Sequence, residues 1–354
     1  MSFLRVCFVI CISLLTALSA LATDNSFKLD FDGDGKTEIA VYREGSRSPF
    51  IAPEQSYWYF LNTQTGAVTT RQWGRTLDVP APADYDNDGK TDLAIYRWWD
   101  FETGDTNEWW INKSATGGHQ ILVYEPGYNK FSRNYFGDGR AETGQIYLID
   151  INQDPTEDCF ISIYFAGDME GNAIRKNVSD TCNVIPTPVP GDYNNDGTSE
   201  IAVFENQTFK VWFAPYNSGY TAPNMTQFMD VDMAVPGDYD GDGKTDFAGT
   251  KGVNGRLLWR IKQSGSGTDL EVDFGFATDK PVPGDYDGDG KTDIAVFRPF
   301  DSSWWIMNSG SGVVSSFYFG FSTDTPLAMP TIPFDPTSNL TNRTSIFQSI
   351  QTKK

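Results

Sequence analysis

Short apolar runs alternate with polar, glycine-rich segments along the whole 354-residue chain. Four of the runs are rich in β-branched and aromatic residues, and each directly follows a group of acidic residues: Ile39 to Arg43, Leu93 to Arg97, Ile201 to Glu205 and Ile294 to Arg298. Runs of this length and composition predict β-strands.

A second, aromatic-rich run follows each acidic segment and its first strand, and it predicts a second strand in every unit. These second runs are Tyr57 to Asn62, Trp109 to Lys113, Phe160 to Ala166, Lys210 to Ala214, Leu257 to Gln263 and Trp304 to Asn308. A third strand and a proline-bearing segment lead into the next unit. The chain is therefore predicted to be all-β, with about four strands per unit, which is the content of one β-propeller blade.

The acidic segments are copies of one nine-residue motif, which reads DYDGDGKTD from Asp285. The copies begin at Asp30, Asp84, Asn134, Asp192, Asp238 and Asp285, so that successive copies start 46 to 58 residues apart. A repeat length in this range is typical of stacked or radial units. Six complete units fit before Asp335, which favours six blades, with seven as the alternative.

Acidic or amide side chains stand at positions 1, 3, 5 and 9 of the motif, and position 7 offers a backbone carbonyl. If the backbone coils, these oxygen atoms converge, and hard oxygen ligands suit Ca²⁺ (Ca2+). Position 6 is Gly in all six copies, where a tight loop needs a left-handed backbone. We expect about five calcium sites, with the metal ligands Asp30, Asp32, Asp34, Lys36, Glu38, Asp84, Asp86, Asp88, Lys90, Asp92, Asp192, Asn194, Asp196, Thr198, Glu200, Asp238, Asp240, Asp242, Lys244, Asp246, Asp285, Asp287, Asp289, Lys291 and Asp293.

The motif begins like an EF-hand loop, but two features separate it from that motif. Position 12 holds Val41, Ile95, Val203 or Val296 where an EF-hand has a bidentate Glu. A strand follows the motif instead of a helix. The calcium loops are therefore expected between strands.

With these residues the chain resembles the FG-GAP or VCBS-type repeats of integrin alpha-like β-propellers, whose blades carry such calcium loops. The resemblance covers roughly Asp30 to Pro333. Its marks are DFDGDGKTEIAVYR from Asp30, DYDNDGKTDLAIYR from Asp84, DYNNDGTSEIAVFE from Asp192, DYDGDGKTDFAGTK from Asp238 and DYDGDGKTDIAVFR from Asp285. It implies an adhesion-type propeller that acts as a binding or scaffold module with structural calcium.

The third copy departs from the motif, because Phe136 stands at position 3 between Asn134 and Asp138. An aromatic ring donates no oxygen ligand, and we expect weak or no metal binding there. A seventh, eroded copy near Asp335 has no credible ligand set. Ring closure is expected to pair Thr331 to Pro333 or Ser345 to Ile350 with the N-terminal blade, which would remove an exposed sheet edge.

Composition and charge narrow the class of protein. The repeats run without a long linker, so residues 23–354 are expected to form one β-propeller domain that can build a core with 39% apolar residues. The net charge of -20 and the missing basic patches argue against nucleic acid as a ligand.

The N-terminus reads as a secretory signal peptide, residues 1–22, with Arg5 before an apolar run and small residues at Ala20 and Ala22. An uncleaved membrane anchor is the alternative. With cleavage, we expect a secreted, extracellular or periplasmic monomer without a membrane span. Cys159 and Cys182 are then the two cysteines of the mature chain, and a pair in an exported protein is plausibly a disulfide.

Aromatic residues and carboxylates raise the question of a site for a ligand or for catalysis. Trp58, Trp109, Trp259 and Trp304 recur in one register and are expected to pack blade against blade, with sugar stacking as the alternative. Trp98, Trp99 and Phe101 break that pattern and are candidates for an exposed contact.

No nucleophile set can be assembled except around the single His119, and the repeated carboxylates are assigned to metal. We therefore expect no enzyme, and an unknown protein or glycan as the partner. A carbohydrate-binding, lectin-like propeller is one alternative, and a polysaccharide lyase or hydrolase is another.

Overall fold

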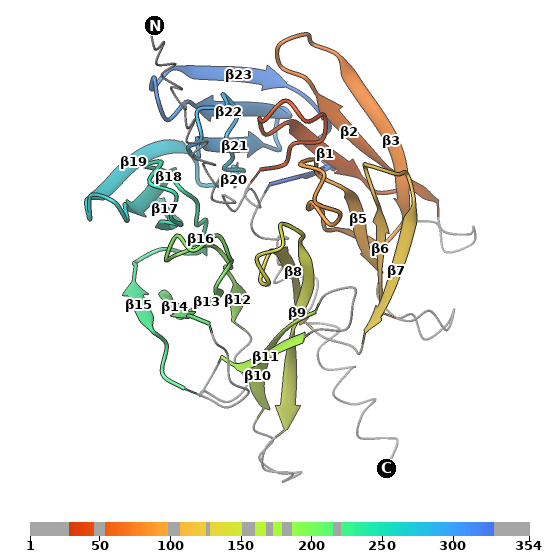
Figure 1. Cartoon of the computed structure of the whole chain (residues 1–354). Helices are drawn as coiled ribbons and strands as arrows, with labels where there is room; N and C mark the ends of the chain where they lie inside the picture. Colours follow the sequence, from red (N-terminus) through yellow and green to blue (C-terminus); the bar gives the residue numbers. More distant parts are fainter. Residues whose placement is uncertain are drawn as a thin grey trace, which may run out of the picture.

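Twenty-four strands form six four-stranded antiparallel sheets in the part of the chain that the structure describes. The structure is a computed structural model, and it describes residues 28–45, 54–97, 107–124, 128–150, 160–167, 173–178, 186–214 and 221–328. The sheets follow one another around a ring as the blades of a propeller (Figure 1). This arrangement confirms the predicted all-β fold, and six sheets agree with the favoured number.

The blades are numbered here in the order of their nine-residue loops. Blade 1 holds β24 (Thr325–Pro326), β1 (Ile39–Arg43), β2 (Gln55–Leu61) and β3 (Val68–Arg75). Blade 2 holds β4 (Val79–Pro80), β5 (Leu93–Arg97), β6 (Asn107–Asn112) and β7 (His119–Tyr124). Blade 3 holds β8 (Tyr128–Arg133), β9 (Glu142–Asp150), β10 (Phe160–Gly167) and β11 (Ala173–Asn177).

The other three blades repeat this order. Blade 4 holds β12 (Thr187–Pro188), β13 (Ile201–Glu205), β14 (Thr208–Trp212) and β15 (Met225–Phe228). Blade 5 holds β16 (Met233–Ala234), β17 (Phe247–Val253), β18 (Arg256–Lys262) and β19 (Asp269–Phe276). Blade 6 holds β20 (Lys280–Pro281), β21 (Ile294–Arg298), β22 (Ser303–Met307) and β23 (Val314–Tyr318).

The predicted first strands of four blades have the bounds of β1, β5, β13 and β21, because each begins directly after the acidic loop and ends at a charged residue. The predicted second strands match β2, β6, β10, β14, β18 and β22 within two residues at either end. Within the described residues, no helix is long and apolar enough to cross a membrane.

The ring closes through β24, which pairs with β1 so that Val41 lies opposite Pro326 and Tyr42 opposite Thr325. A C-terminal strand therefore completes the N-terminal blade, which removes a free sheet edge as expected. The pairing segment is earlier than predicted, and both segments proposed from the sequence lie outside the described residues. The Asp-Thr-Pro at 324 to 326 has the same form as Asp78-Val79-Pro80 before the second loop, a signal that could have located this strand.

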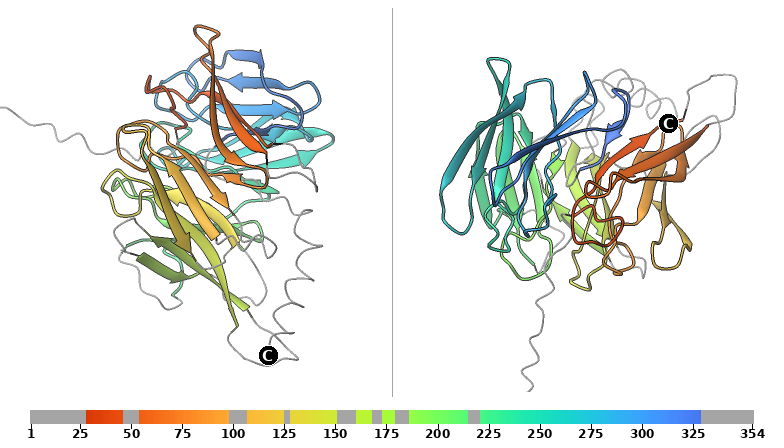
Figure 2. Two further views of the ribbon diagram at one scale, coloured as in Figure 1. Left: turned by 90° about the vertical axis from the view of Figure 1, so that its right-hand side faces the viewer. Right: turned by 90° about the horizontal axis from the view of Figure 1, so that it is seen from above.

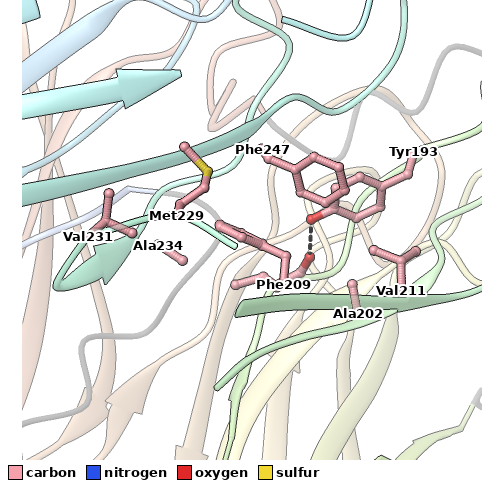
Figure 3. Packing of buried hydrophobic residues seen from close by; sticks show 9 residues of the cluster. Tyr193, Ala202, Phe209, Val211, Met229, Val231, Ala234 and Phe247 are labelled. Carbon is pink, nitrogen blue, oxygen red and sulfur yellow. Dashed lines mark hydrogen bonds between the residues drawn. The ribbon is translucent and has the colours of Figure 1, made fainter. Parts of the chain in front are cut away.

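The apolar core consists of six clusters, each of which spans the boundary between two neighbouring blades. At the boundary of blades 4 and 5, for example, Phe209 and Tyr193 pack against Phe247 (Figure 3). The Tyr193 hydroxyl donates to the carbonyl of Val189 at 2.7 Å, so its polar end is satisfied although the ring is buried.

Four recurrent tryptophans, Trp58, Trp109, Trp259 and Trp304, lie at such boundaries and are at most 1% exposed. Trp259 of blade 5 shares a cluster with Val296 of blade 6, and its indole nitrogen donates to the carbonyl of Phe274 at 2.9 Å. Burial confirms the packing role for these residues over sugar stacking. Trp98, Trp99 and Phe101 lie outside the described residues, as do Cys159 and Cys182.

Candidate metal centres

Each nine-residue loop leads directly into one strand of its blade, which is β1, β5, β9, β13, β17 or β21 (Figure 1). In the fifth loop the Asp238 carboxylate accepts hydrogen bonds from the backbone nitrogens of Gly241 and Gly243, at 2.6 and 2.9 Å. The Asp242 carboxylate accepts one from Lys244 at 2.9 Å. Acidic side chains thus coil the backbone around themselves and turn their remaining oxygens inward.

Glycine at position 6 is required by the backbone. In all six copies this residue has a positive φ between 83° and 87°: Gly35, Gly89, Gly139, Gly197, Gly243 and Gly290. A side chain would strain that conformation, so the conformation predicted from the sequence is confirmed.

A closed ring of backbone hydrogen bonds connects the six loops. The position 8 nitrogen of each loop donates to the position 1 carbonyl of the preceding loop, at 2.6 to 2.7 Å. The pairs are Thr91 to Asp30, Ala141 to Asp84, Ser199 to Asn134, Thr245 to Asp192, Thr292 to Asp238, and Thr37 to Asp285. Because the last bond returns to the first loop, the ring has six members and no free end.

Five of the loops bring at least three carboxylates together, with one oxygen atom of each within 4.8 Å of the others. The groups are Asp30 with Asp32, Asp34 and Glu38; Asp84 with Asp86 and Asp92; Asp192 with Asp196 and Glu200; Asp238 with Asp240 and Asp246; and Asp285 with Asp287 and Asp289. These are the five loops predicted to bind metal.

Three predicted carboxylate ligands, Asp88, Asp242 and Asp293, stand outside these groups. The Ser114 and Ser264 hydroxyls donate to Asp88 and Asp242 at 2.8 and 2.9 Å. The Asp293 carboxylate accepts from the backbone nitrogens of Tyr286 and Ser309, at 2.9 and 2.7 Å. The carbonyl ligands at Lys36, Lys90, Thr198, Lys244 and Lys291 stay predictions.

These serines were missed by the reasoning from sequence. They lie in the hairpins between the third and fourth strands of the observed blades, β6 and β7 or β18 and β19, and each tethers its hairpin to the acidic loop of the same blade. A recurring Ser-x-Ser/Thr-Gly at Ser114, Ser264 and Ser309 is the signal that could have revealed them.

Burial and mutual repulsion shift the acidity of the position 9 carboxylates. Burial, together with the neighbouring aspartates, raises the pKa of Glu38 and Glu200 to about 8. Burial raises the pKa of Asp246 to about 7 and that of Asp92 and Asp293 to about 6. The protein alone therefore compensates these charges incompletely.

Buried oxygen atoms provide a test of whether a cation fits. Both carboxylate oxygens of Asp86 and the amide oxygen of Asn194 are buried without a hydrogen-bond partner among the described residues. Both residues occupy position 3 of their loops, which faces the other acidic oxygens. A hard divalent cation would satisfy these atoms and reverse the pKa shifts, so the donor sets fit Ca²⁺.

Family comparisons agree with the repeat seen in the structure. A model described as FG-GAP-like repeat matches residues 30–95 and 238–296, and a model described as FG-GAP repeat matches residues 280–317. The matched segments include the first, second, fifth and sixth loops and lie on four-stranded blades. The chain is an FG-GAP-repeat β-propeller.

More distant likenesses of this FG-GAP propeller are to solved structures. TolB from Acinetobacter baumannii is 12% identical with a TM-score of 0.49; the match covers 82% of this chain and 63% of that chain. An Agrocybe aegerita lectin that recognises non-reducing terminal N-acetylglucosamine is 12% identical with a TM-score of 0.43; the match covers 85% of this chain and 91% of that chain. No curated protein matches the chain. Likenesses at this level carry nothing about function.

The third FG-GAP loop keeps the conformation without the ligands. Asn134 accepts from the backbone nitrogen of Gly137 at 2.8 Å, and Asp138 accepts from that of Arg140 at 2.9 Å. Phe136 at position 3 is 38% exposed and points no oxygen into the loop. The described residues place no group of three acidic, histidine or cysteine side chains there.

A buried cation stands directly before this third loop. Arg133 is 1% exposed, and it occupies the position that Leu29, Ala83, Gly191, Gly237 and Gly284 fill in the other repeats. Its charge lowers the pKa of the neighbouring Tyr193, against the larger upward effect of burial. The one loop without a metal ligand set is thus the one with a buried guanidinium at its start.

Proposed function

We propose that this FG-GAP propeller is a calcium-binding scaffold or binding module in which about five calcium ions are structural. The observation that carries the proposal is the convergence of carboxylate oxygens within 4.8 Å in five loops. Such groups repel one another in the absence of a cation, whereas a bound ion would hold each loop in its coiled form.

Structural calcium would act on the whole ring, because the six loops are joined by backbone hydrogen bonds. Each loop also holds the start of a second strand, so an ion in it supports the blade that follows. Ions bound only by the folded protein add to its stability by mass action.

Calcium titration of metal-free protein tests the proposal. We expect about five ions per chain by calorimetry and a large rise in melting temperature, with magnesium as the control cation. Mg²⁺ prefers a smaller, octahedral site and should stabilise the protein less. If metal-free protein takes up no calcium and its melting curve is unchanged, calcium has no structural role here.

Export belongs to the same proposal, because extracellular calcium modules work at dissociation constants of about 10⁻⁴ to 10⁻³ M, well above cytosolic calcium. A mature N-terminus at residue 23 in protein recovered outside the cell would support it. Recovery of the protein with residues 1–22 attached and inside the cell would contradict it.

A carbohydrate-binding role is the second candidate, and exposed aromatic rings beside arginines favour it. Phe321 is 59% exposed and lies against the guanidinium of Arg43, 3.9 Å from ring centroid to Cζ. An activity on polysaccharides has no such observation behind it, and an assay for new reducing ends would detect it.

A further inference from the structure

The innermost strand of blade 1 is assembled from two separate segments of the chain. The C-terminal segment is β24 with Leu327, whose backbone nitrogen donates to β1 at 2.9 Å. The N-terminal segment is residues 28–29, and the carbonyl of Leu29 accepts from the last residue of the first loop at 3.0 Å. In blade 5 one continuous segment, residues 233–237, makes both of these bonds. Figure 2 shows the red start and the blue end of the described chain meeting at this place, which is called the seam below.

Lys28 lies in the seam, and its ammonium group reaches across to the sixth loop. Its Nζ lies 2.7 Å from Oδ2 of Asp285 and donates to the carbonyl of Gly35 in the first loop at 3.0 Å. The side chain of Lys28 is 26% exposed and that of Asp285 is 5% exposed. In the other copies of the repeat this place holds Pro82, Ser132, Pro190, Pro236 or Pro283. The ammonium group is therefore a feature of the seam and not of the repeat.

The carboxylate that Lys28 contacts belongs to a candidate metal centre. Asp285 is position 1 of the sixth loop and a member of the group of converging carboxylates in that loop. It accepts from the backbone nitrogens of Gly288 and Gly290, at 2.7 and 3.1 Å. Asp238 accepts from the equivalent two glycines of the fifth loop, at 2.6 and 2.9 Å. The two loops therefore share these backbone hydrogen bonds, and the ammonium of Lys28 is an addition to the sixth.

An ammonium group at this position has opposite consequences with and without a divalent cation. In metal-free protein it compensates part of the negative charge of the sixth loop, and it joins the N-terminal segment of the seam to blade 6. A calcium ion in the loop would compete with the ammonium for the Asp285 carboxylate, because two cations beside one carboxylate repel each other. The repulsion is screened less where the carboxylate is buried, as that of Asp285 is.

We propose that Lys28 is an internal cation that lowers the calcium affinity of the sixth loop and couples the occupation of that loop to the seam. Without calcium, the ammonium holds the N-terminal segment of the seam against Asp285. With calcium, the ion replaces the ammonium as the partner of Asp285, and the ion pair across the seam is lost. The sixth site therefore binds calcium more weakly than the fifth. This inference rests on the proposed calcium-binding function and adds a residue that determines affinity at one site.

Calcium titration of the full chain by calorimetry tests the proposal with two neutral replacements, Lys28→Met and Lys28→Gln. We expect both variants to keep the wild-type stoichiometry and to bind calcium about tenfold more tightly at one site. Lys28→Arg keeps the positive charge and should stay within about twofold of the wild type. Lys251→Met is the matched control, because the side chain of Lys251 is 29% exposed and pairs with Asp230, which lies outside the loops. It should leave all calcium affinities unchanged.

A second background assigns the change in affinity to the sixth loop. Asp287→Ala removes the position 3 carboxylate of that loop and should abolish its calcium site. In this background Lys28→Met should no longer change any calcium affinity, because the site on which Lys28 acts is gone. An equal gain in affinity in both backgrounds overturns the proposal, since Lys28 would then act through the net charge or through the first loop.

Melting temperature, measured on the same variants, separates the two states of the seam. Lys28→Met should lower the melting temperature of metal-free protein, because Asp285 loses its partner, and this loss should disappear in saturating calcium. Lys251→Met should shift the melting temperature equally in both conditions. An equal shift for Lys28→Met in both conditions, or an unaltered calcium isotherm, overturns the role of Lys28 alone. A wild-type chain that takes up no calcium overturns the proposed function together with this inference.

Discussion

The third and fifth FG-GAP loops have the same backbone but different ligand sets. Gly137 and Gly139 have φ values of 73° and 86°, and Gly241 and Gly243 have 78° and 87°. Position 1 accepts a hydrogen bond from position 4 in both loops. Each loop donates the same backbone hydrogen bond to the loop before it, from Ala141 and from Thr245.

The difference lies at positions 1 and 3, where Asn134 and Phe136 replace Asp238 and Asp240. Glycines and side-chain-to-backbone hydrogen bonds are thus sufficient to specify the loop conformation. The acidic groups are a separate feature, because they add a repulsion that a cation or protonation relieves. Loop shape belongs to the fold of this propeller, and a group of converging carboxylates is added to it in five of the six copies.

Removal of calcium should separate the third loop from the fifth more strongly than any other change. Each site contributes about 2.7 kcal/mol of unfolding free energy when free calcium is 100 times its dissociation constant. We expect chelation to lower the melting temperature sharply and to increase hydrogen exchange in the five acidic loops. Backbone amides of the third loop should change least, and hydrogen exchange resolved by segment will compare it with the fifth. Equal loss of protection in all six loops would show that the third depends on calcium through its neighbours.

The pH dependence of stability should change sign between the metal-free and calcium-loaded protein. In metal-free protein, the raised pKa values of Glu38 and Glu200 (about 8) and Asp246 (about 7) mean that the folded state holds protons more tightly than the unfolded state. This stabilisation is fully present below about pH 4, near the unfolded pKa values, and is lost as pH rises through 7 to 8. Metal-free protein should therefore melt at lower temperature at pH 8 than at pH 5.

Calcium binds the deprotonated carboxylates, so its stabilising effect should grow over the same range. Melting curves at four pH values from 5 to 8, with and without calcium, give both slopes. Parallel curves in the two conditions would mean that the buried carboxylates are not the calcium ligands.

A substitution at position 3 tests whether that side chain stabilises the protein through bound calcium or through the loop conformation. Asp240→Ala should lower calcium stoichiometry by one and lower stability in saturating calcium by about 3 kcal/mol, the contribution of one ion. In metal-free protein the change should be near zero or stabilising, because one repelling carboxylate is gone. Phe136→Ala is the matched control at the same position of the third loop, and it should leave stoichiometry unchanged. A stability loss for Asp240→Ala that is independent of calcium would assign Asp240 to the fold.

Much of this structure follows from local sequence. Repeat spacing predicts the blades, and strand bounds are accurate where acidic residues precede an apolar run, as at Ile39 and Ile294. Loop conformation also follows, because the recurrent glycine at position 6 marks a left-handed backbone that other residues adopt only with strain. The closing strand β24 was placed too late in the chain, because a two-residue strand carries no apolar pattern and is recognised by comparison with Val79–Pro80.

Contacts between distant segments could not be read from the pattern. The serine clamps on Asp88 and Asp242 join residues more than 20 positions apart in sequence, and they depend on how the hairpin folds back. No local pattern marks Arg133, which the fold buries close enough to Tyr193 of the next blade to affect its pKa. Such contacts depend on the three-dimensional fold, so no local sequence pattern predicts them.

Restoring the missing ligands should convert the third loop into a sixth site, with the smallest effect of the four. The double substitution Asn134→Asp with Phe136→Asp supplies carboxylates at positions 1 and 3 of a loop that already has the required backbone. We expect calcium stoichiometry to rise by one, with a weaker site than the other five because the guanidinium of the buried Arg133 repels the ion. Adding Arg133→Ala to this double variant should strengthen calcium binding at the new site, although it removes a buried side chain. The single variant Asn134→Asp is the control for one added charge. Unchanged calcium stoichiometry in the double and triple variants would show that backbone shape and carboxylates together are not sufficient for calcium binding. The serine hydrogen bonds made by Ser114 and Ser264 in two of the other loops would then be part of the requirement.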